Sequence, residues 1–340
     1  MIPRLEIHFD RDERRLFKQG REYYMPRGEY WLNHCRSGIQ LALQALDLKP
    51  QTGVGMMVYN CHTVMNAIWQ AGCKPVFVDV AEGMTIDMED LARKREQMQV
   101  LIVTHLFGIV NDVKEIKRLY PNLIVIEDCA HCFEHEIDGE FGVYSVGQGK
   151  FPSIGDGGIL IVKSEKLSVK IEALYASLPR YTKKQERKLF MLLWMKAMMY
   201  SKGLYWMTRK LKGMRELGNE SVREEVTIKK MSRGIANILG QKRADYPAAV
   251  QERLHRAEQM GHWISDNGVL MVGENAFMAV ARTEDLEGLK KEFAKKGVET
   301  ETHFMHCIEW AREFGYKRGS CPNAEELTKQ LLMIPTYTRI

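Results

Sequence analysis

The sequence predicts an α/β protein whose larger domain is built on a mostly parallel β-sheet. Between residues 38 and 163, short apolar runs rich in β-branched residues alternate with amphipathic stretches of helical length. This alternation is typical of a parallel sheet covered by helices on both faces. Strand and helix patterns alternate again, on a shorter scale, near the C-terminus. We therefore expect a large domain over 1–245 and a smaller C-terminal α/β domain over 246–340.

The expected elements follow from the same periodicity. The strands of the large domain are expected at 53–59, 74–80, 99–107, 122–128, 142–147 and 157–163. Helices are expected at 39–48, 62–72, 86–98 and 112–120. Two further helical patterns follow, a Met- and aromatic-rich one at 186–215 and a longer one at 229–265. The small domain is expected to contain strands at 268–272 and 276–282 and helices at 284–298 and from 323 onward.

Composition excludes several classes of protein. With 45% hydrophobic and 27% charged residues, the chain is neither mainly disordered nor collagen-like nor a coiled coil. The charged N-terminus lacks the apolar segment of a signal peptide, and no long apolar run indicates a membrane span. The cysteines are scattered and odd in number, which is typical of reduced thiols. We therefore expect a cytoplasmic protein.

The net charge of +5 is concentrated in one segment. Residues 180–230 hold fourteen basic and five acidic residues, so the rest of the chain is net acidic. This distribution argues against a nucleic-acid-binding protein and favours a local anionic partner. The Met and aromatic residues of 186–215 fit a core-packing or dimer-interface helix pair. They also fit peripheral contact with a membrane, or with a lipid-linked or diphosphate-bearing substrate.

The stretch 126–158 carries the chemistry. The strand at 122–128 ends in Asp128, and ligands of parallel sheets bind beyond such strand ends. Lys150 follows twenty-two residues later, bracketed by glycines. A lysine in such a turn near a buried aspartate suits Schiff-base chemistry, because the amine needs a lowered pKa and a close backbone approach to a cofactor. The aspartate would hold a pyridine nitrogen protonated and make the ring an electron sink.

Two other interpretations of this stretch are weaker. It is not a phosphate-binding P-loop, because no Ser or Thr follows Lys150 and the upstream glycine spacing differs. Cys129 and Cys132, with His135 nearby, have a spacing that leaves a zinc or redox site open. The candidate second half of such a site is Cys307 and Cys321 with His303 and His306. We favour small buried thiols beside the sheet and expect no metal site, because no second C-x-x-C pair exists.

Taken in order, these residues resemble the DegT/StrS-type sugar aminotransferases, a branch of the fold-type-I pyridoxal phosphate (PLP) enzymes. The family pattern is roughly E-D-x-A-(Q/H), followed by S-F-x-x-x-K-x-x-x-x-G-(E/D)-G-G. This chain has EDCAH at 127–131 and SVGQGKFPSIGDGG at 145–158, with the same spacing. Further family landmarks are resembled by RSGI at 36–39, GCKPVFVDV at 72–80, HLFG at 105–108 and PNAEELTKQLLMIPTY at 322–337. The resemblance extends from about 30 to 338 and implies the PLP-dependent transferase fold of type I.

The resemblance assigns a role to each matching residue. Lys150 is implied to be the catalytic Schiff-base lysine that also moves the substrate proton, and Asp128 the partner of the pyridinium nitrogen. His131 is implied to lie by the cofactor ring. The remaining implied cofactor-binding residues are Gly38, Ile39 and Ser145. Gly38 and Ile39 are expected to open a helix whose N–H groups and dipole favour the phosphate, and Ser145 matches a phosphate-binding serine of the family.

Three family features are replaced in this sequence. Ile39 stands where the family usually has Thr, so one phosphate hydroxyl is missing while the backbone N–H remains. Cys61 stands at the position of the aromatic that stacks on the cofactor, with Tyr59 or His62 as candidate substitutes. Ile228 stands where the family often has an Asn that reaches the phosphate of the partner subunit, and a neighbouring lysine is its candidate electrostatic replacement.

The function implied by the resemblance is transamination. The amino group would pass from glutamate, the expected donor, to a nucleotide-linked keto sugar in polysaccharide or secondary-metabolite biosynthesis, within a homodimer whose sites lie between subunits. A sugar dehydratase of the same family is one alternative, but such enzymes normally carry His in place of the Schiff-base lysine, so Lys150 argues against it. A non-catalytic regulator on the same fold is the other. Whether Lys150 carries a cofactor that turns over distinguishes these functions.

Overall fold

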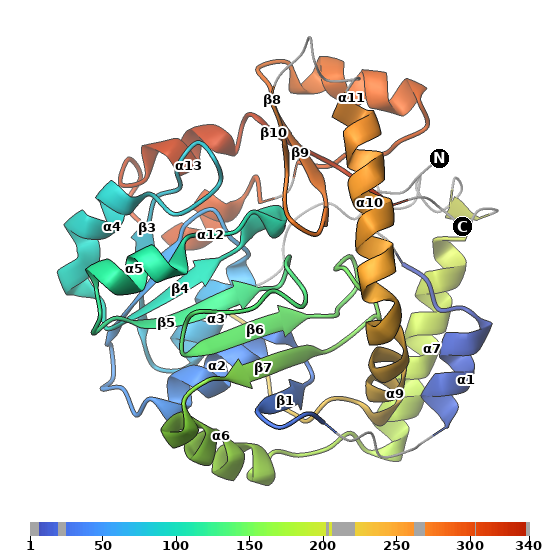
Figure 1. Ribbon diagram of the computed structural model, residues 1–340, viewed down its shortest axis with the longest axis horizontal. Helices are drawn as coiled ribbons and strands as arrows, with labels where there is room; N and C mark the ends of the chain where they lie inside the picture. Colours follow the sequence, from blue (N-terminus) through green and yellow to red (C-terminus); the bar gives the residue numbers. More distant parts are fainter. Residues whose placement is uncertain are drawn as a thin grey trace.

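The computed structural model describes residues 7–19, 25–201, 204–205, 222–261, 269–302 and 304–337. At its centre is a seven-stranded sheet with the order β1-β7-β6-β5-β4-β2-β3 (Figure 1). Strands β3, β2, β4, β5 and β6 are parallel, whereas β7 is antiparallel to both β6 and β1. Helices lie on both faces of this sheet (Figure 1). The predicted mostly parallel α/β architecture is therefore confirmed.

The elements of the large sheet are short. Its strands are β1 (Glu29–Leu32), β2 (Gly53–Met57), β3 (Lys74–Val78), β4 (Val100–Thr104), β5 (Ile124–Cys129), β6 (Phe141–Ser145) and β7 (Gly158–Val162). The helices that connect or flank them are α2 (Cys35–Ala45), α3 (His62–Gln70), α4 (Met88–Lys94), α5 (Val113–Leu119) and α6 (Glu165–Ser177). The predicted strands coincide with observed ones because each is an apolar run that the flanking helices cover on both faces.

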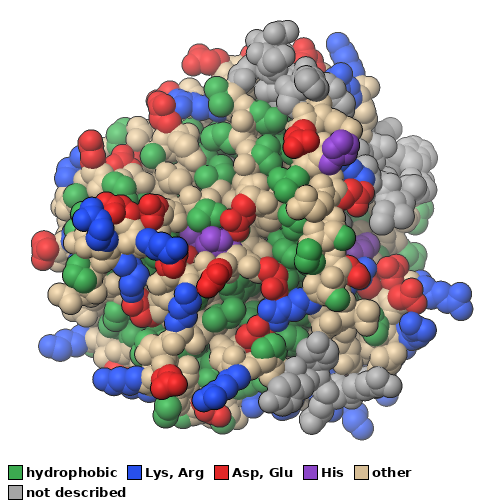
Figure 2. Space-filling model, in the orientation of Figure 1, with side chains coloured by type: hydrophobic (Ala, Val, Ile, Leu, Met, Phe, Trp, Pro, Cys, Tyr) green, Lys and Arg blue, Asp and Glu red, His purple; other side chains and the backbone are tan. Residues whose placement is uncertain are grey.

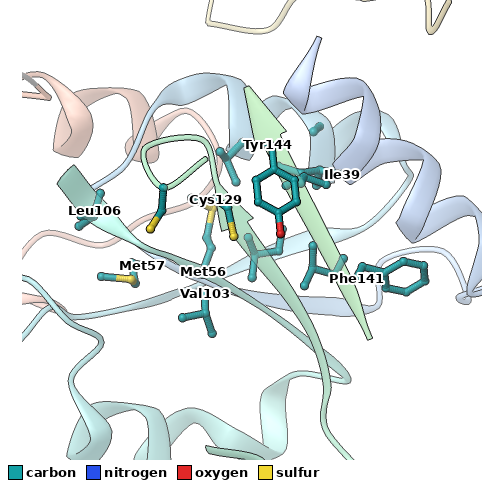
Figure 3. Close-up of a cluster of buried hydrophobic side chains, with 14 of the residues drawn as sticks. Ile39, Met56, Met57, Val103, Leu106, Cys129, Phe141 and Tyr144 are labelled. Atoms are coloured by element: carbon teal, nitrogen blue, oxygen red, sulfur yellow. The ribbon is translucent and has the colours of Figure 1, made fainter. Parts of the chain in front are cut away.

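The interior of this layered unit is densely apolar. Every residue of β4 and β6 is buried. Figure 3 shows part of the core, in which Ile39 from α2 lies with Met56 from β2, Cys129 from β5 and Tyr144 from β6. The side chain that replaces the family's threonine at position 39 is thus a core side chain, 1% exposed.

A second, smaller sheet follows α10 (Tyr246–Gly261). It is antiparallel, with the order β10-β9-β8, and consists of β8 (Val269–Val272), β9 (Ala279–Arg282) and β10 (Leu331–Ile334). With α11 (Leu286–Lys295) and the end of α10 it forms its own small core, which includes Met260, Phe293 and Leu332. The predicted domain boundary at 245/246 coincides with the start of α10 and stays a prediction.

The other two C-terminal helices, α12 (Cys307–Arg312) and α13 (Pro322–Leu327), contribute to the main core instead. The start of α13 is held by Asp79, which follows β3. Its carboxylate accepts hydrogen bonds from the backbone N–H groups of Asn323 at 3.0 Å and Ala324 at 2.8 Å. The C-terminal segment therefore returns to the large sheet (Figure 1).

Two expectations on the helical middle of the chain need correction. The pattern at 229–265 is not one helix, because α9 (Arg233–Lys242) is separated from α10 by a 3₁₀ turn at Arg243–Asp245. The helix expected at 186–215 is observed as α7 (Lys183–Met199), and most of the rest of that range lies outside the described residues. In Figure 1, α7 lies beside the N-terminal helix α1 (Arg11–Lys18). None of the described helices combines the length and the apolar character needed to span a membrane.

Candidate active site

Asp128 lies at the carboxyl end of β5, directly beside Thr104 at the end of β4. Its carboxylate is 3% exposed and accepts hydrogen bonds from the Thr104 hydroxyl at 3.2 Å and from the Ala130 N–H at 3.1 Å. Burial raises the pKa of Asp128, and the Ala130 hydrogen bond and the nearby Lys150 charge oppose that shift. The predicted aspartate is therefore a buried carboxylate held in one orientation by its neighbours.

Lys150 is carried by the tight loop between β6 and β7. Gly149, with φ of 72°, adopts a left-handed backbone conformation that favours glycine, and the Lys150 N–H donates to the Gly147 carbonyl at 3.2 Å. This turn places the lysine Nζ 2.8 Å from His131 Nε2. The loop thus brings together two residues that are nineteen positions apart.

His131 is oriented toward that lysine by a hydrogen bond of its own. Its Nδ1 accepts the backbone N–H of Phe107 at 3.1 Å. A neutral imidazole with an accepting Nδ1 carries its proton on Nε2. That Nε2–H points at Lys150 Nζ, so the contact is satisfied when Nζ is a neutral amine with a free electron pair. The His131 ring is also stacked on Phe277, with ring centroids 4.5 Å apart.

The surroundings of Lys150 also favour the neutral form of its amine. Burial is the largest influence and lowers the pKa of the Lys150 amine, while Cys61, Asp128 and Cys35 partly oppose it. These groups come from the start of α3, from β5 and from the start of α2. A buried amine with a lowered pKa beside a carboxylate suits Schiff-base formation.

The start of α2 differs from the sequence expectation. The helix begins at Cys35, three residues before Gly38, so the first-turn N–H groups that lack an intrahelical acceptor are those of Cys35 and Arg36. Gly38 lies inside the helix, where a Cβ would come within 2.9 Å of Val143 Cγ1. The expectation that Gly38 and Ile39 open this helix is thus wrong, and their part in phosphate binding stays a prediction.

Gly158 places Ser145, the remaining candidate phosphate-binding residue, close to the start of α2. Ser145, the last residue of β6, pairs with Gly158 on β7. A Cβ on Gly158 would lie 2.4 Å from the Cys35 backbone nitrogen, so only glycine allows β7 to approach the start of α2 this closely. The Ser145 hydroxyl accepts the Gly147 N–H at 3.4 Å. Ser145 and the first turn of α2 therefore both lie next to Gly158.

Sequence reasoning missed two polar residues behind Asp128. Asn60 follows β2, and its amide donates to the Thr104 hydroxyl at 2.8 Å, which in turn donates to Asp128. Cys35 Sγ lies 3.8 Å from the other Asp128 oxygen. The signal was present, because Asn60 and Thr104 both follow or end parallel strands next to β5.

The candidate replacements for the stacking aromatic have ring contacts of their own. The Tyr59 ring packs edge-on against Phe304 at 5.8 Å, and the His62 ring packs against Trp310 at 4.9 Å. Their part in stacking on the cofactor stays a prediction. The His131 ring is stacked with the rings of Phe277 at 4.5 Å, Phe107 at 5.6 Å and Phe304 at 6.1 Å. The lysines beside Ile228 line the edge of β1, where the Lys229 N–H and C=O both bond to Asn33.

The proposed second half of a cysteine site is also wrong. Cys321 lies near Lys94, whose Nζ is 3.6 Å from Cys321 Sγ, at the far edge of the sheet beside β3. In the part of the chain that the structure describes, neither Cys321 nor Cys307 belongs to a group of metal-type ligands. His303 lies outside the described residues.

The described residues fit PLP. Asp128 offers a buried carboxylate to a ring nitrogen, Lys150 offers a neutral amine to an aldehyde, and the start of α2 offers N–H groups and a positive dipole end to a phosphate. Arg36, in that first turn, has a buried Nε for which the described residues provide no hydrogen-bond partner. A cation with an unmet donor at this helix start is what an anionic group would complete.

Comparison with known proteins gives a consistent result. Residues 23–197, just over half of the chain, match the DegT/DnrJ/EryC1/StrS aminotransferase family. An uncharacterised protein of Methanocaldococcus jannaschii is 24% identical over 91% of this chain and 81% of its own length. A UDP-N-acetyl-3-dehydro-α-D-glucosamine 3-aminotransferase of Acidithiobacillus ferrooxidans is 33% identical over 41% of this chain and 42% of its own length.

The fold comparison covers almost the whole chain. The crystal structure of the sugar aminotransferase CalS13 from Micromonospora echinospora has a TM-score of 0.71 to this structure. The two share 16% sequence identity, and the match covers 99% of this chain and 95% of the other. The predicted fold class is therefore confirmed for the chain as a whole.

Proposed function

The chain belongs to the DegT/DnrJ/EryC1/StrS aminotransferase family, and from this premise we propose that it is a PLP-dependent sugar aminotransferase. Its amino donor is glutamate, and its acceptor is the ketone of a nucleotide-linked sugar. The observation that carries the proposal is the contact between Lys150 Nζ and His131 Nε2 at 2.8 Å beside the buried Asp128 carboxylate. The Acidithiobacillus relative, by its name an aminotransferase of a UDP-linked 3-dehydro sugar, supports this class of acceptor.

PLP, when bound, supplies an electron sink that stabilises negative charge on the carbon next to the transferred nitrogen. In this chain the Lys150 amine would hold the cofactor, and the Asp128 carboxylate would keep its ring nitrogen protonated. Ser145 and the first turn of α2 would hold its phosphate. Thr104 and Ala130 keep the Asp128 carboxylate in place through their hydrogen bonds.

Lys150 also has the position of a general base. Burial lowers its pKa, which favours the neutral amine that accepts the proton released from the α-carbon of the donor. The same nitrogen returns a proton to the acceptor in the second half of the reaction. His131 positions the amine, because its own Nδ1 is anchored by the Phe107 N–H.

The test is an absorption spectrum of the purified protein with added PLP, followed by excess glutamate. A visible band from a lysine-bound cofactor is expected to appear and then to disappear with glutamate. A band that glutamate leaves unchanged would point to another donor or another PLP reaction. No band at all would contradict the enzyme function and favour a non-catalytic regulator on this fold.

The exposed face of α7 carries a stripe of large apolar side chains. It carries Met191, Trp194, Met195 and Met198, each at least 40% exposed, at the spacing of one helical stripe. The other side of α7 is packed, since Phe190 contacts the rings of Phe9 and Phe17. Exposed apolar stripes of this size mark interaction surfaces.

Charge favours an anionic bilayer as the partner of this face. Exposed basic residues precede the stripe on α7: Lys183, Lys184, Arg187 and Lys188. By contrast, acidic and basic side chains are interspersed on the face shown in Figure 2. We propose that a cytoplasmic homodimer, the assembly that the family resemblance implies, contacts the membrane surface through α7.

Replacing Trp194 and Met198 with glutamate is expected to abolish co-flotation with vesicles containing phosphatidylglycerol, while the dimer mass measured by light scattering stays unchanged. The matched control is Val169→Glu, which alters an apolar residue on α6 that is 69% exposed. The opposite result would be that the wild type does not float with the vesicles and that the double variant is no longer a dimer. That result would identify this face as the subunit interface.

A further inference from the structure

A cluster of metal-type ligands lies next to the candidate active site and has no part in the amino-transfer chemistry. Cys132 and His135 lie on the loop after β5, and Glu274 lies between β8 and β9, about 140 positions away in the sequence. One oxygen of Glu274 is 2.9 Å from Cys132 Sγ and 2.9 Å from His135 Nδ1. The three ligand atoms all lie within 4.8 Å of one another.

The donor set is the one that zinc prefers. Thiolate, imidazole and carboxylate are its usual protein ligands, with bonds of about 2.0 to 2.3 Å in a tetrahedral arrangement. Such bonds separate neighbouring ligand atoms by roughly 3.2 to 3.8 Å. The two observed separations therefore need to open by less than about 1 Å, which small side-chain rotations provide.

A carboxylate lies behind the second nitrogen of His135. The His135 Nε2 lies 3.8 Å from Glu127 Oε2, which is an ion-pair distance and too long for a hydrogen bond. Glu127 is itself fixed, because it accepts the N–H groups of Asp138 and Gly139 and contacts His105 Nε2 at 2.9 Å. A carboxylate behind the histidine orients the ring so that Nδ1 faces the cluster.

The carboxylate of the cluster is carried by a rigid loop. The Glu274 N–H donates to the Gly108 carbonyl at 2.9 Å, and the Asn275 amide donates to the His131 carbonyl at 3.0 Å. A Cβ on Gly273 would lie 2.1 Å from the Gly108 carbonyl carbon, so the two backbones touch. Glu274 is thus held in place before any metal binds, which favours affinity.

Cys129, the other cysteine of the C-x-x-C pair, does not share this position. Figure 3 shows its thiol among core side chains, and burial raises its pKa well above the usual range. The sequence-based interpretation as a plain buried thiol fits Cys129. It also fits the burial of Cys132, which is 0% exposed, but the sequence could not show that the Glu274 carboxylate lies beside the Cys132 thiol.

We propose that Cys132, His135 and Glu274 bind one Zn²⁺ ion, with water as the fourth ligand. Water has access, because the side chains of His135 and Glu274 are 14% and 46% exposed. Binding releases the Cys132 thiol proton to solvent. The ion fastens the segment that carries Phe277, which stacks on His131, to the loop that carries His131.

The test is Co²⁺ and Zn²⁺ binding by the full-length chain after treatment with EDTA. The wild type is expected to bind one ion per chain and to show a thiolate-to-cobalt charge-transfer band. Cys132→Ser is expected to lose that band, and Glu274→Gln to weaken zinc binding at least about 100-fold. Glu274 is partly exposed, so its variant keeps the test valid even if Cys132→Ser fails to fold.

Cys73→Ser is the matched control, because Cys73 is a buried cysteine whose thiol donates to the Ala71 carbonyl at 3.8 Å. It is expected to bind zinc as the wild type does. A wild type without bound ion or charge-transfer band would overturn the proposal. So would zinc binding that survives in both Cys132→Ser and Glu274→Gln. These readouts are independent of PLP, so failure of the zinc site and failure of the aminotransferase function are separate results.

Discussion

Lys150→Ala is expected to remove the visible absorption of the PLP-loaded protein and its amino-transfer activity. The variant lacks the amine that bonds to the cofactor and the base that moves the proton. Loss of the proton transfer alone costs about 10²- to 10⁴-fold in rate. Absorption spectra after gel filtration, together with the rate of conversion by glutamate, measure both effects.

Lys163→Ala is the matched control. Lys163 follows β7 and is exposed, so its loss changes the charge of the same hairpin without touching the site. The control is expected to keep the band and the rate. An unchanged band in Lys150→Ala would show that another lysine holds the cofactor.

The pH dependence of cofactor attachment follows from the same amine. Only the deprotonated amine reacts, and burial lowers the pKa of Lys150 from the ordinary value of 10.5. Cys35, Cys61 and Asp128 face the amine and oppose the shift without reversing it. Band formation is therefore expected to reach half of its maximum below pH 10.5, in contrast to a free lysine side chain.

The large sheet could be predicted from the sequence because its strands are buried on both faces. Runs such as the one that became β4 contain apolar residues at nearly every position, and helices of amphipathic pattern separate them. β1 was not predicted, although it pairs with β7 at the sheet edge. The apolar pattern of β1 covers only four residues after the turn at Gly28, which is too short to distinguish a strand from a loop.

The 3₁₀ turn between α9 and α10 escaped prediction for a different reason. The chain keeps its helical periodicity through Arg243–Asp245, so the local pattern does not show where the α-helical hydrogen bonding is interrupted. There Arg243 forms a two-pronged ion pair with Glu29 on β1, at 2.9 Å for both hydrogen bonds. A contact 214 residues apart in the sequence leaves no trace in local pattern.

The same distinction between local pattern and tertiary contact applies to the residues of the candidate site. Asp128 and Lys150 were found because their residue types and their spacing follow a strand and a glycine-rich loop. Asn60 and Thr104 escaped notice because each is an ordinary polar residue, and only the order of the parallel strands makes them neighbours of Asp128. Phe277 and Glu274 come from the other end of the chain, so neither could be linked to His131 or Cys132 before the fold was known.

Asp128→Asn is expected to retain the fold while slowing conversion by glutamate on the order of 100-fold or more. The amide has the same shape, and its oxygen still accepts the Ala130 N–H that the carboxylate accepts at 3.1 Å. What disappears is the negative charge that keeps a ring nitrogen protonated. The amide nitrogen takes the place of the oxygen that accepts the Thr104 hydroxyl, and that hydroxyl can rotate to accept instead, whereas a backbone N–H cannot. The neutral amide also removes a desolvated charge, so the melting temperature is expected to stay close to that of the wild type.

Asp79→Asn is the matched control, because it removes the charge of another buried carboxylate that has no place in the candidate site. Asp79 also follows a parallel strand, is also 3% exposed, and has a pKa that burial raises. Its two carboxylate oxygens accept the N–H groups of Asn323 and Ala324 at the start of α13. In the asparagine variant the side-chain NH₂ group would face one of these N–H donors, so the melting temperature is expected to fall. Its rate of conversion per folded molecule is expected to match the wild type, since Asp79 follows β3, which is separated from β5 by the two strands β2 and β4. Equal loss of rate in both variants would mean that any buried carboxylate at this edge supports the reaction, and Asp128 would then have no specific role.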